Sequence, residues 1–233
     1  MTLAQDLEEM RSTIEEIEFP PGDIESQEPP LESYLHLQQI ILLLKCLEWL
    51  WKDRQDYFAA GNLTIYYSPN QKKSEYFRGP DFFLVRDTER KPRKSWVVWQ
   101  EDGKYPNVIV ELLSDSTATT DRGVKKRIYQ DVFRTPEYFW FSPHTLEFQG
   151  FLLVGGTYEA IAPNERGHLW SEQMQLFLGV ENEKLRFFTP EGQLVPTPEE
   201  AAENAQQQLD IERQQKEKMA AKLRELGIDP EQL

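Results

Sequence analysis

The sequence contains one cysteine and no long hydrophobic run. Cys46 has no second cysteine with which to form an internal disulfide, so we expect it to be a small buried side chain in an apolar helix. The longest apolar run, Ile40 to Leu44, is far too short to span a bilayer, so no membrane partner is expected. The first residues lack the basic start and apolar core of a secretory signal, which makes the cytoplasm the default location.

The net charge of −14 argues against a general affinity for nucleic acid, because such affinity comes from neutralising phosphates. The charge is unevenly spread, however. Residues 1–32 carry ten acids and one base, whereas residues 72–134 carry fourteen bases and ten acids. The centre of the chain is therefore mildly basic. Within it, the basic cluster from Arg90 to Lys94 is either a solvated loop or a patch that contacts phosphates.

Changes in composition divide the chain into three predicted parts. Residues 1–30 are acidic and broken by prolines, which predicts a weakly ordered arm. Residues 31–196 contain the apolar runs of a folded domain. Residues 197–233 are rich in Ala, Gln, Glu and Lys, which predicts a long polar helix with a broken apolar stripe. Whether this helix is solvated, packs on its own domain or pairs with another chain is left open.

Hydrophobic patterns within the domain predict two neighbouring strands joined by a helix. The run from Val108 to Leu113 predicts a strand buried on both faces. A helix is expected over residues 121–133 and another buried strand over residues 138–141. Because a strand, a helix and a strand follow within about 35 residues, we expect the two strands to be parallel.

The spacing within the helix at residues 121–133 also predicts which side faces the sheet. Val124, Ile128 and Val132 recur every four residues and are expected to face it. Lys125 and Tyr129 repeat the same spacing one residue later, so they are expected on the flank of that face.

An earlier helix is predicted over residues 31–56, with an apolar face that includes Leu35, Ile40, Leu43, Leu44, Leu47 and Leu50. Glu32 and His36 stand four residues apart at its start, on one side of the helix. Glu32 is either an outer metal ligand or a first-turn acid that favours the helix dipole. His36 is either a hydrogen-bonding partner of the site or an ordinary satisfied polar group.

Two acids lie where buried strands would be expected to carry apolar residues. Asp81 opens the run Phe82 to Val85, and Glu111 interrupts its own strand. Burying a lone charge is unfavourable, so each acid is expected to have a partner, a metal ion or a raised pKa. Two carboxylates on neighbouring strand ends suit a hard divalent cation, and the backbone carbonyl of Leu112 can add a ligand.

Lys125 completes the predicted site from the following helix. A lysine over the same edge of the sheet can orient or deprotonate a water and offset the charge of a phosphate. It would do so better if the site lowered its pKa from the usual value of about 10.4. A cation, carboxylates and a lysine are the groups that phosphodiester hydrolysis needs.

At these residues the sequence resembles a known family, the Uma-two family of restriction-endonuclease-like proteins within the PD-(D/E)XK nuclease superfamily. The resemblance covers roughly residues 32–188, and residues 221–227 resemble a tail that many members carry. It rests on these motifs: Pro80-Asp81, Val110-Glu111-Leu112-Leu113-Ser114, Asp121-Arg122-Gly123-Val124-Lys125 with Tyr129, and Thr135-Pro136-Glu137-Tyr138-Phe139.

The resemblance implies an α/β fold, with a restriction-endonuclease-like mixed β-sheet core, flanking helices and, in this chain, the long C-terminal helix. It also implies Mg²⁺-dependent cleavage of nucleic acid, with Mn²⁺ as a substitute ion. Metal binding is carried onto Asp81 and Glu111, with Glu32 as the added acid from the first helix, and the catalytic lysine role onto Lys125.

One departure from the wider superfamily affects the lysine. Its usual position, two residues after the acid on the same strand, is Leu113 in this chain. The resemblance implies that the family supplies the lysine from the helix instead. Lys125 matches the Asp-Arg-Gly-x-Lys spacing, and Lys126 is the second candidate.

Three functions are compatible with this sequence. The first is a metal-dependent endonuclease that acts on nucleic acid, with DNA as the expected target although RNA is left open. The second is a catalytically inactive nuclease fold that serves as a binding or regulatory module, in which Lys125 and Glu111 form a structural ion pair. The third is another two-carboxylate hydrolase such as a glycosidase, which gives the lysine no role. Cutting both strands of a duplex calls for two sites, so a homodimer is expected by that logic.

Overall fold

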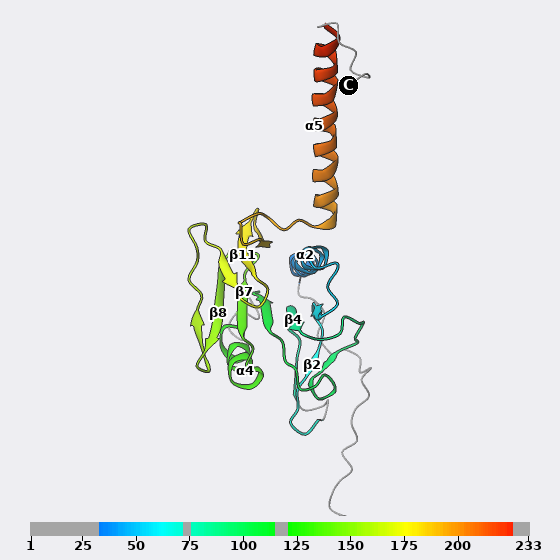
Figure 1. The fold of residues 1–233 in the computed structure, drawn as a ribbon. Coiled ribbons are helices and arrows are strands. Elements are labelled where there is room, and N and C mark those ends of the chain that lie inside the picture. The colour runs from blue at the N-terminus through cyan, green and yellow to red at the C-terminus, as the bar shows by residue number, and fades with distance from the viewer. Residues whose placement is uncertain (1–32, 72–75, 115–120, 226–233) are drawn as a thin grey trace, which may run out of the picture.

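The computed structural model describes residues 33–71, 76–114 and 121–225 (Figure 1). Its centre is a six-stranded sheet in the order β1, β4, β6, β7, β8, β9. The β6–β7 pair is parallel, as predicted, and the other pairs are antiparallel. The predicted mixed sheet is therefore confirmed. The strands are β1 (Tyr57–Ala60), β4 (Phe82–Arg86), β6 (Val108–Leu112), β7 (Glu137–Phe141), β8 (Phe148–Val154) and β9 (Thr157–Ala160).

Two small sheets pack beside the central one. One is an antiparallel sheet in the order β10, β11, β12, with bounds Leu169–Ser171, Leu176–Glu181 and Lys184–Phe188. The other has the order β3, β2, β5, with bounds Phe77–Arg78, Ile65–Tyr66 and Trp96–Val97, and a short 3₁₀ turn, η1 (Val98–Gln100), follows β5. These sheets help to cover opposite faces of the central sheet.

Alternation along β6 distributes its side chains between two separate cores. Val108, Val110 and Leu112 pack with the helix α2 (Tyr34–Leu50) and with the β10–β12 sheet. Ile109 and Leu113 face the other way, toward the second small sheet and the helix after β6. Because successive side chains of a strand point to opposite faces, Glu111 lies on this second face. Every β6 side chain is buried.

The helix between β6 and β7 covers residues 121–133, as predicted, but it is not a regular α-helix. It consists of a π-helical turn η2 (Asp121–Lys125), one short α-helical stretch α4 (Lys126–Ile128) and a second π-helical turn η3 (Tyr129–Phe133). Such turns are rare and often occur at functional sites. Arg134 ends the helix in a left-handed conformation, with φ of 55°.

The predicted buried face of this helix is wrong. Val124 and Val132 are each 48% exposed, and only Ile128 of the predicted stripe is partly packed. The stripe that meets the sheet is the neighbouring one, with Tyr129 and Phe133 fully buried. Both stripes have the same four-residue spacing, so spacing could not separate them. The large rings and the polar contacts with Glu111 decide the outcome.

The helix α2 begins at a regular cap and packs with most of its predicted face. The hydroxyl of Ser33 accepts a hydrogen bond from the backbone N–H of His36, which satisfies one free donor of the first turn. Leu43 and Leu47 are buried, and so is Cys46, which confirms its predicted burial. Burial also raises the pKa of the Cys46 thiol to about 11. Leu35 and Leu50 remain exposed, so the predicted face is too long at both ends.

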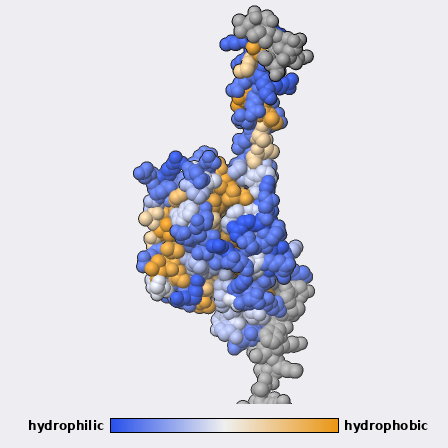
Figure 2. Space-filling view, viewed as in Figure 1, coloured by the Kyte–Doolittle hydropathy of each residue, from blue (hydrophilic) through white to orange (hydrophobic). Residues whose placement is uncertain are grey.

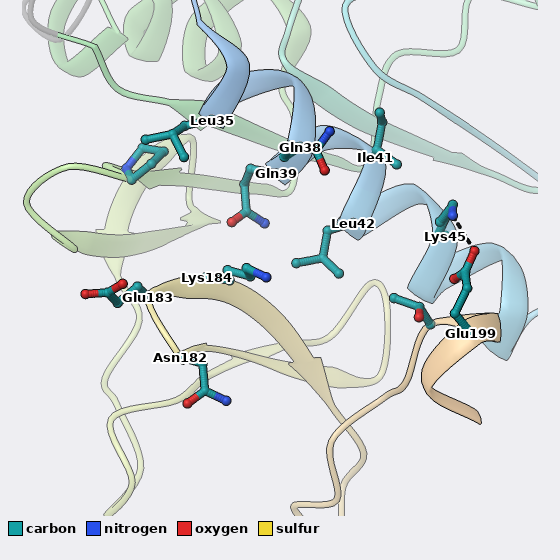
Figure 3. Close-up of a pocket in the computed structure, with 12 residues that line it drawn as sticks. Leu35, Gln38, Gln39, Ile41, Leu42, Lys45, Asn182, Glu183, Lys184 and Glu199 are labelled. Carbon is teal, nitrogen blue, oxygen red and sulfur yellow. Dashed lines mark hydrogen bonds and ion pairs between the residues drawn. The ribbon is translucent and has the colours of Figure 1, made fainter. Parts of the chain in front are cut away.

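Within the residues that the structure describes, the long helix α5 (Pro198–Glu225) is attached to the domain at its start. Thr197 and Glu200 form a capping box, in which the Thr197 hydroxyl accepts from the Glu200 N–H and the Glu200 carboxylate accepts from the Thr197 N–H. Glu200 also pairs with Arg186 on β12 at 2.6 Å, and Glu199 pairs with Lys45 on α2 (Figure 3). Beyond these contacts, α5 projects away from the sheets (Figure 1).

Among the described residues, no helix is both long and apolar enough to cross a bilayer.

A second buried acid, Glu137 at the start of β7, gives a prediction for the pH dependence of stability. Its carboxylate accepts hydrogen bonds from the Ser171 hydroxyl and the Gln173 N–H, and burial raises its pKa to about 7. A carboxyl whose pKa is raised by folding stabilises the folded state while it is protonated. Its contribution is therefore present below about pH 4.5 and is lost as the pH rises through 7, by on the order of 3 kcal/mol.

We expect Glu137→Gln, which cannot ionise, to reduce the loss of unfolding free energy between pH 5 and pH 8. Urea titrations at several pH values measure this slope. Glu159→Gln, at an exposed position, is the control and should keep the wild-type slope. Equal slopes for Glu137→Gln and the wild type would contradict the account of this acid.

Candidate active site

The structure brings Asp81 and Glu111 together at one end of the β4–β6 pair. The ladder pairs Phe82 with Val110, so extending the register by one residue sets Asp81 opposite Glu111. The backbone joins them in both directions. The Asp81 N–H approaches Glu111 Oε2 at 3.4 Å, and Asp81 Oδ2 accepts from the Leu112 N–H at 2.7 Å. The two predicted carboxylates therefore share one corner of the sheet.

Glu111 is fully buried, and this burial sets its protonation. Loss of solvent raises its pKa to about 7; the ammonium of Lys125 acts against this shift, and the charge of Asp81 adds to it. The hydroxyl of Tyr129 donates to Glu111 Oε1 at 2.6 Å. Both carboxylate oxygens therefore have donors, as a buried acid requires.

Lys125 reaches this carboxylate from the helix that covers the second face of the sheet. Its Nζ lies 3.2 Å from Glu111 Oε2, and its side chain is 21% exposed. The partner of the fully buried acid is therefore a side chain that is itself partly exposed. Tyr129, one turn further along the same helix, makes the contact with the other carboxylate oxygen.

Lys126, the alternative lysine, has different contacts. Its Nζ lies 3.4 Å from the centre of the Phe151 ring and 5.5 Å from that of Trp140. Burial against these rings lowers its pKa. Lys126 therefore packs on an aromatic surface, whereas Lys125 contacts the carboxylate of Glu111.

His36 contacts the site from α2, on the opposite side of the sheet. Its Nε2 lies 2.7 Å from the carbonyl oxygen of Leu112, which can only accept, so Nε2 must carry the proton. In the neutral ring Nδ1 then accepts from the Ser33 hydroxyl, 3.2 Å away. Both backbone polar groups of Leu112 therefore have side-chain partners. Asp81 accepts from its N–H, and His36 donates to its carbonyl oxygen.

The donor set at this corner fits a hard divalent cation. Asp81 and Glu111 offer carboxylate oxygens, and the Leu112 carbonyl retains a second lone pair beside His36. Within residues 33–71, 76–114 and 121–225, no group of three His, Cys, Asp or Glu side chains is placed to hold a metal ion. Backbone and water oxygens would therefore have to complete the coordination. Glu32, the predicted third acid, lies outside the described residues.

Sequence reasoning missed one polar contact of this corner. Tyr129 was expected on the flank of its helix, yet its hydroxyl bonds to Glu111. Its position four residues after Lys125 is the signal that could have found it, because residues four apart lie on the same side of a helix.

The basic cluster from Arg90 to Lys94 is largely engaged within the protein. Arg93 forms a bidentate ion pair with Glu101, and the Arg93 side chain is almost entirely buried. Arg90 lies over the Tyr57 ring and 3.8 Å from Glu48, and Lys91 pairs with Glu89. These contacts favour a structural loop over a phosphate-contacting patch.

A separate cavity of about 360 Å³ lies between α2, β12 and the start of α5 (Figure 3). Leu35, Leu42 and Lys184 are among its lining residues, and the Lys45–Glu199 ion pair closes one side. Asp81, Glu111 and Lys125 are not among the described residues that line this cavity. The cavity is therefore distinct from the carboxylate corner.

The chain is similar to known proteins in its sequence and in its fold. The model of the Uma2 family, described as "Putative restriction endonuclease", matches residues 4–181. Among solved structures, the chain is similar to a protein from Anabaena variabilis described as "a putative nuclease belonging to DUF820". The two share 11% identity with a TM-score of 0.47, over 64% of this chain and 77% of that one. No curated protein matches.

Tyr129→Phe tests how strongly the buried carboxylate depends on its donors. The change leaves Glu111 Oε1 without the Tyr129 hydroxyl in a site closed to water. We expect the unfolding free energy to fall by about 1–3 kcal/mol. Chemical denaturation above pH 7, where Glu111 is mostly ionised, measures the effect.

Tyr57→Phe is the matched control, because the buried Tyr57 hydroxyl has no hydrogen-bond partner among the residues that the structure describes. It should change stability far less than Tyr129→Phe. Similar losses for the two variants would show that the hydroxyl contact with Glu111 contributes nothing specific.

Proposed function

The chain belongs to the Uma2 family of restriction-endonuclease-like proteins, and we propose that it is a metal-dependent endonuclease that hydrolyses phosphodiester bonds of nucleic acid. In this proposal Asp81 and Glu111 hold Mg²⁺ or Mn²⁺ and Lys125 assists the attacking water. DNA is the proposed target. The family match and the geometry of the carboxylate corner support this function.

One observation carries the proposal: a fully buried glutamate faces a second carboxylate across a strand pair and contacts a partly exposed lysine. A purely structural acid in this position would be costly, because desolvation opposes its charge. A site that binds a cation explains why the acid is retained, since metal binding favours the ionised carboxylate.

A divalent cation at this corner would supply positive charge that polarises a phosphodiester and offsets the charge developing on it during hydrolysis. The protein's own groups have the remaining tasks. Asp81 and Glu111 supply anionic oxygens, and Tyr129 fixes the orientation of the Glu111 carboxylate. The Nζ of Lys125, which lies 3.2 Å from Glu111 Oε2, would donate to a phosphate oxygen or hold the proton of a water beside Glu111.

Basic side chains are concentrated on the helix that carries Lys125. Arg122, Lys125, Lys126 and Arg127 lie within six residues of one helix, in a chain that is acidic overall. Arg122 is exposed, pairs with Glu147 and lies near the Trp140 ring. Phosphates are bound mainly by such lysine and arginine side chains. This segment therefore supports an approach of nucleic acid from the Lys125 side.

Metal binding can be tested through stability. A ligand that binds only the folded protein raises its unfolding free energy, by about 2.7 kcal/mol at one hundred times its Kd. We expect Mg²⁺ or Mn²⁺ to raise the melting temperature of the wild type and to leave that of Glu111→Gln unchanged.

Glu137→Gln is the control for this metal effect, because it removes another fully buried glutamate, on the neighbouring strand β7. Its ion-induced shift should equal that of the wild type even if its starting melting temperature differs. A shift that survives in Glu111→Gln, or that is lost in Glu137→Gln, would place the ion elsewhere.

Cleavage separates the nuclease from a catalytically inactive module. Supercoiled plasmid DNA with Mg²⁺ should be nicked or linearised by the wild type. Lys125→Met should lower the rate by about 100-fold or more, since general acid–base groups contribute 10²–10⁴ in rate. Lys126→Met should retain most of the activity.

Equal activity of Lys125→Met and the wild type would assign Lys125 a structural ion pair only. Metal binding without cleavage of DNA or of single-stranded RNA would favour the binding-module function. Circular dichroism of each variant verifies that the fold is intact.

A further inference from the structure

The helix α5 is long and polar, and the other described residues support little of it. Its 28 residues span about 42 Å at 1.5 Å per residue. Residues 202–219 are all exposed, and the contacts that anchor the helix within the described chain lie at its first turn. Isolated helices in water are marginal, and helices in proteins are stabilised mostly by packing of one face. Counting the described residues, α5 therefore lacks the packing that would normally support a helix of this length.

A seam of regularly spaced residues runs along α5. Steps of four and three residues connect its members, which is the heptad spacing of a coiled coil. Leu209 and Met219 in this seam are 60% and 67% exposed. In Figure 2 hydrophobic residues interrupt the hydrophilic surface of the projecting helix. The α5 seam consists of Ala205, Leu209, Glu212, Lys216, Met219 and Leu223.

Two charged residues occupy the middle of the α5 seam. Glu212 and Lys216 break the apolar stripe and have opposite signs. In a parallel pair of helices each would face its own copy, acid against acid and base against base. In an antiparallel pair centred between them, Glu212 faces the partner's Lys216, and Lys216 faces the partner's Glu212. The charges thus select the antiparallel direction and fix the register.

The same register also matches the other members of the seam. Leu209 then faces the partner's Met219, and Ala205 faces the partner's Leu223. Each layer thereby combines two apolar residues, and the small Ala205 is opposite a large side chain. The two globular bodies lie at opposite ends of such a pair, because each α5 leaves its body at Pro198.

We propose that α5 is a homodimerisation element in which the α5 seams of two copies of this chain pair as an antiparallel coiled coil. The central charges lower its stability compared with an all-apolar seam but exclude other registers and the parallel arrangement. This proposal does not depend on the nuclease function, because none of the site residues lies on α5.

A charge exchange in the full-length protein tests the proposal. Light scattering after size-exclusion chromatography should give a dimer for the wild type. Glu212→Lys or Lys216→Glu alone places like charges together, so dimerisation should weaken about tenfold or more. The double variant Glu212→Lys with Lys216→Glu restores opposite charges and should recover the dimer.

Asp210→Lys makes the same charge change outside the seam and is the matched control, which should remain dimeric. Circular dichroism confirms that each variant keeps its helix. A monomeric wild type would overturn the proposal, whether α5 is solvated, packs on its own domain or binds another protein. So would a double variant that is no better than the single ones.

A distance measurement tests the direction. A spin label on Glu203→Cys lies outside the seam, and Cys46 is too buried to be labelled readily. In the antiparallel register the two labels are separated by about 22 residues of helix, or about 33 Å. A short distance, set only by the width of the helix pair, would indicate a parallel dimer and contradict the proposed pairing.

Discussion

The site depends on one buried charge, the carboxylate of Glu111. A glutamate at this point of β6 would be unfavourable without partners, and three residues from the covering helix and the neighbouring strand supply them. Tyr129 and Lys125 reach it from the covering helix, and the backbone N–H of Asp81 approaches it from the neighbouring strand. Because the pKa of Glu111 is about 7, its protonated and ionised forms are both populated near neutral pH, and a bound cation would favour the ionised form.

Strand geometry explains why these groups meet. The register of β4 and β6 sets Asp81 opposite Glu111, just where β4 begins and the ladder stops. Across the described part of the chain, the pairing of β6 with β4 does not extend to Leu112. Asp81 and His36 satisfy its N–H and carbonyl instead. The end of the ladder therefore brings together the oxygen atoms that the site would use as ligands.

Much of this could be predicted from sequence because strands carry strong local signals. The run Val108 to Leu113 predicts a buried strand, and the helix expected between it and the next strand predicts the parallel pair. The convergence of Asp81, Glu111 and Lys125 follows from the same reasoning together with the family resemblance. The buried face of residues 121–133 could not be predicted. Two stripes with equal spacing competed there, and the choice depended on polar contacts with Glu111 that periodicity does not encode.

Charged side chains are distributed unevenly over the chain, and different groups of them have different contacts. Basic side chains gather on the helix beside the carboxylate corner, while the cluster near Arg93 is used in internal ion pairs. On α5, opposite charges in the middle of the seam would select a partner. The net charge of −14 therefore describes neither surface.

The central claim is that Asp81 and Glu111 together bind a divalent cation. Crystals soaked in Mn²⁺ test it most directly, because manganese gives an anomalous signal that locates the ion. The account predicts a peak in contact with both carboxylates and with the Leu112 carbonyl. An absence of manganese at this corner, with the Lys125 amine still bonded to Glu111, would contradict it and leave the pair as a structural contact.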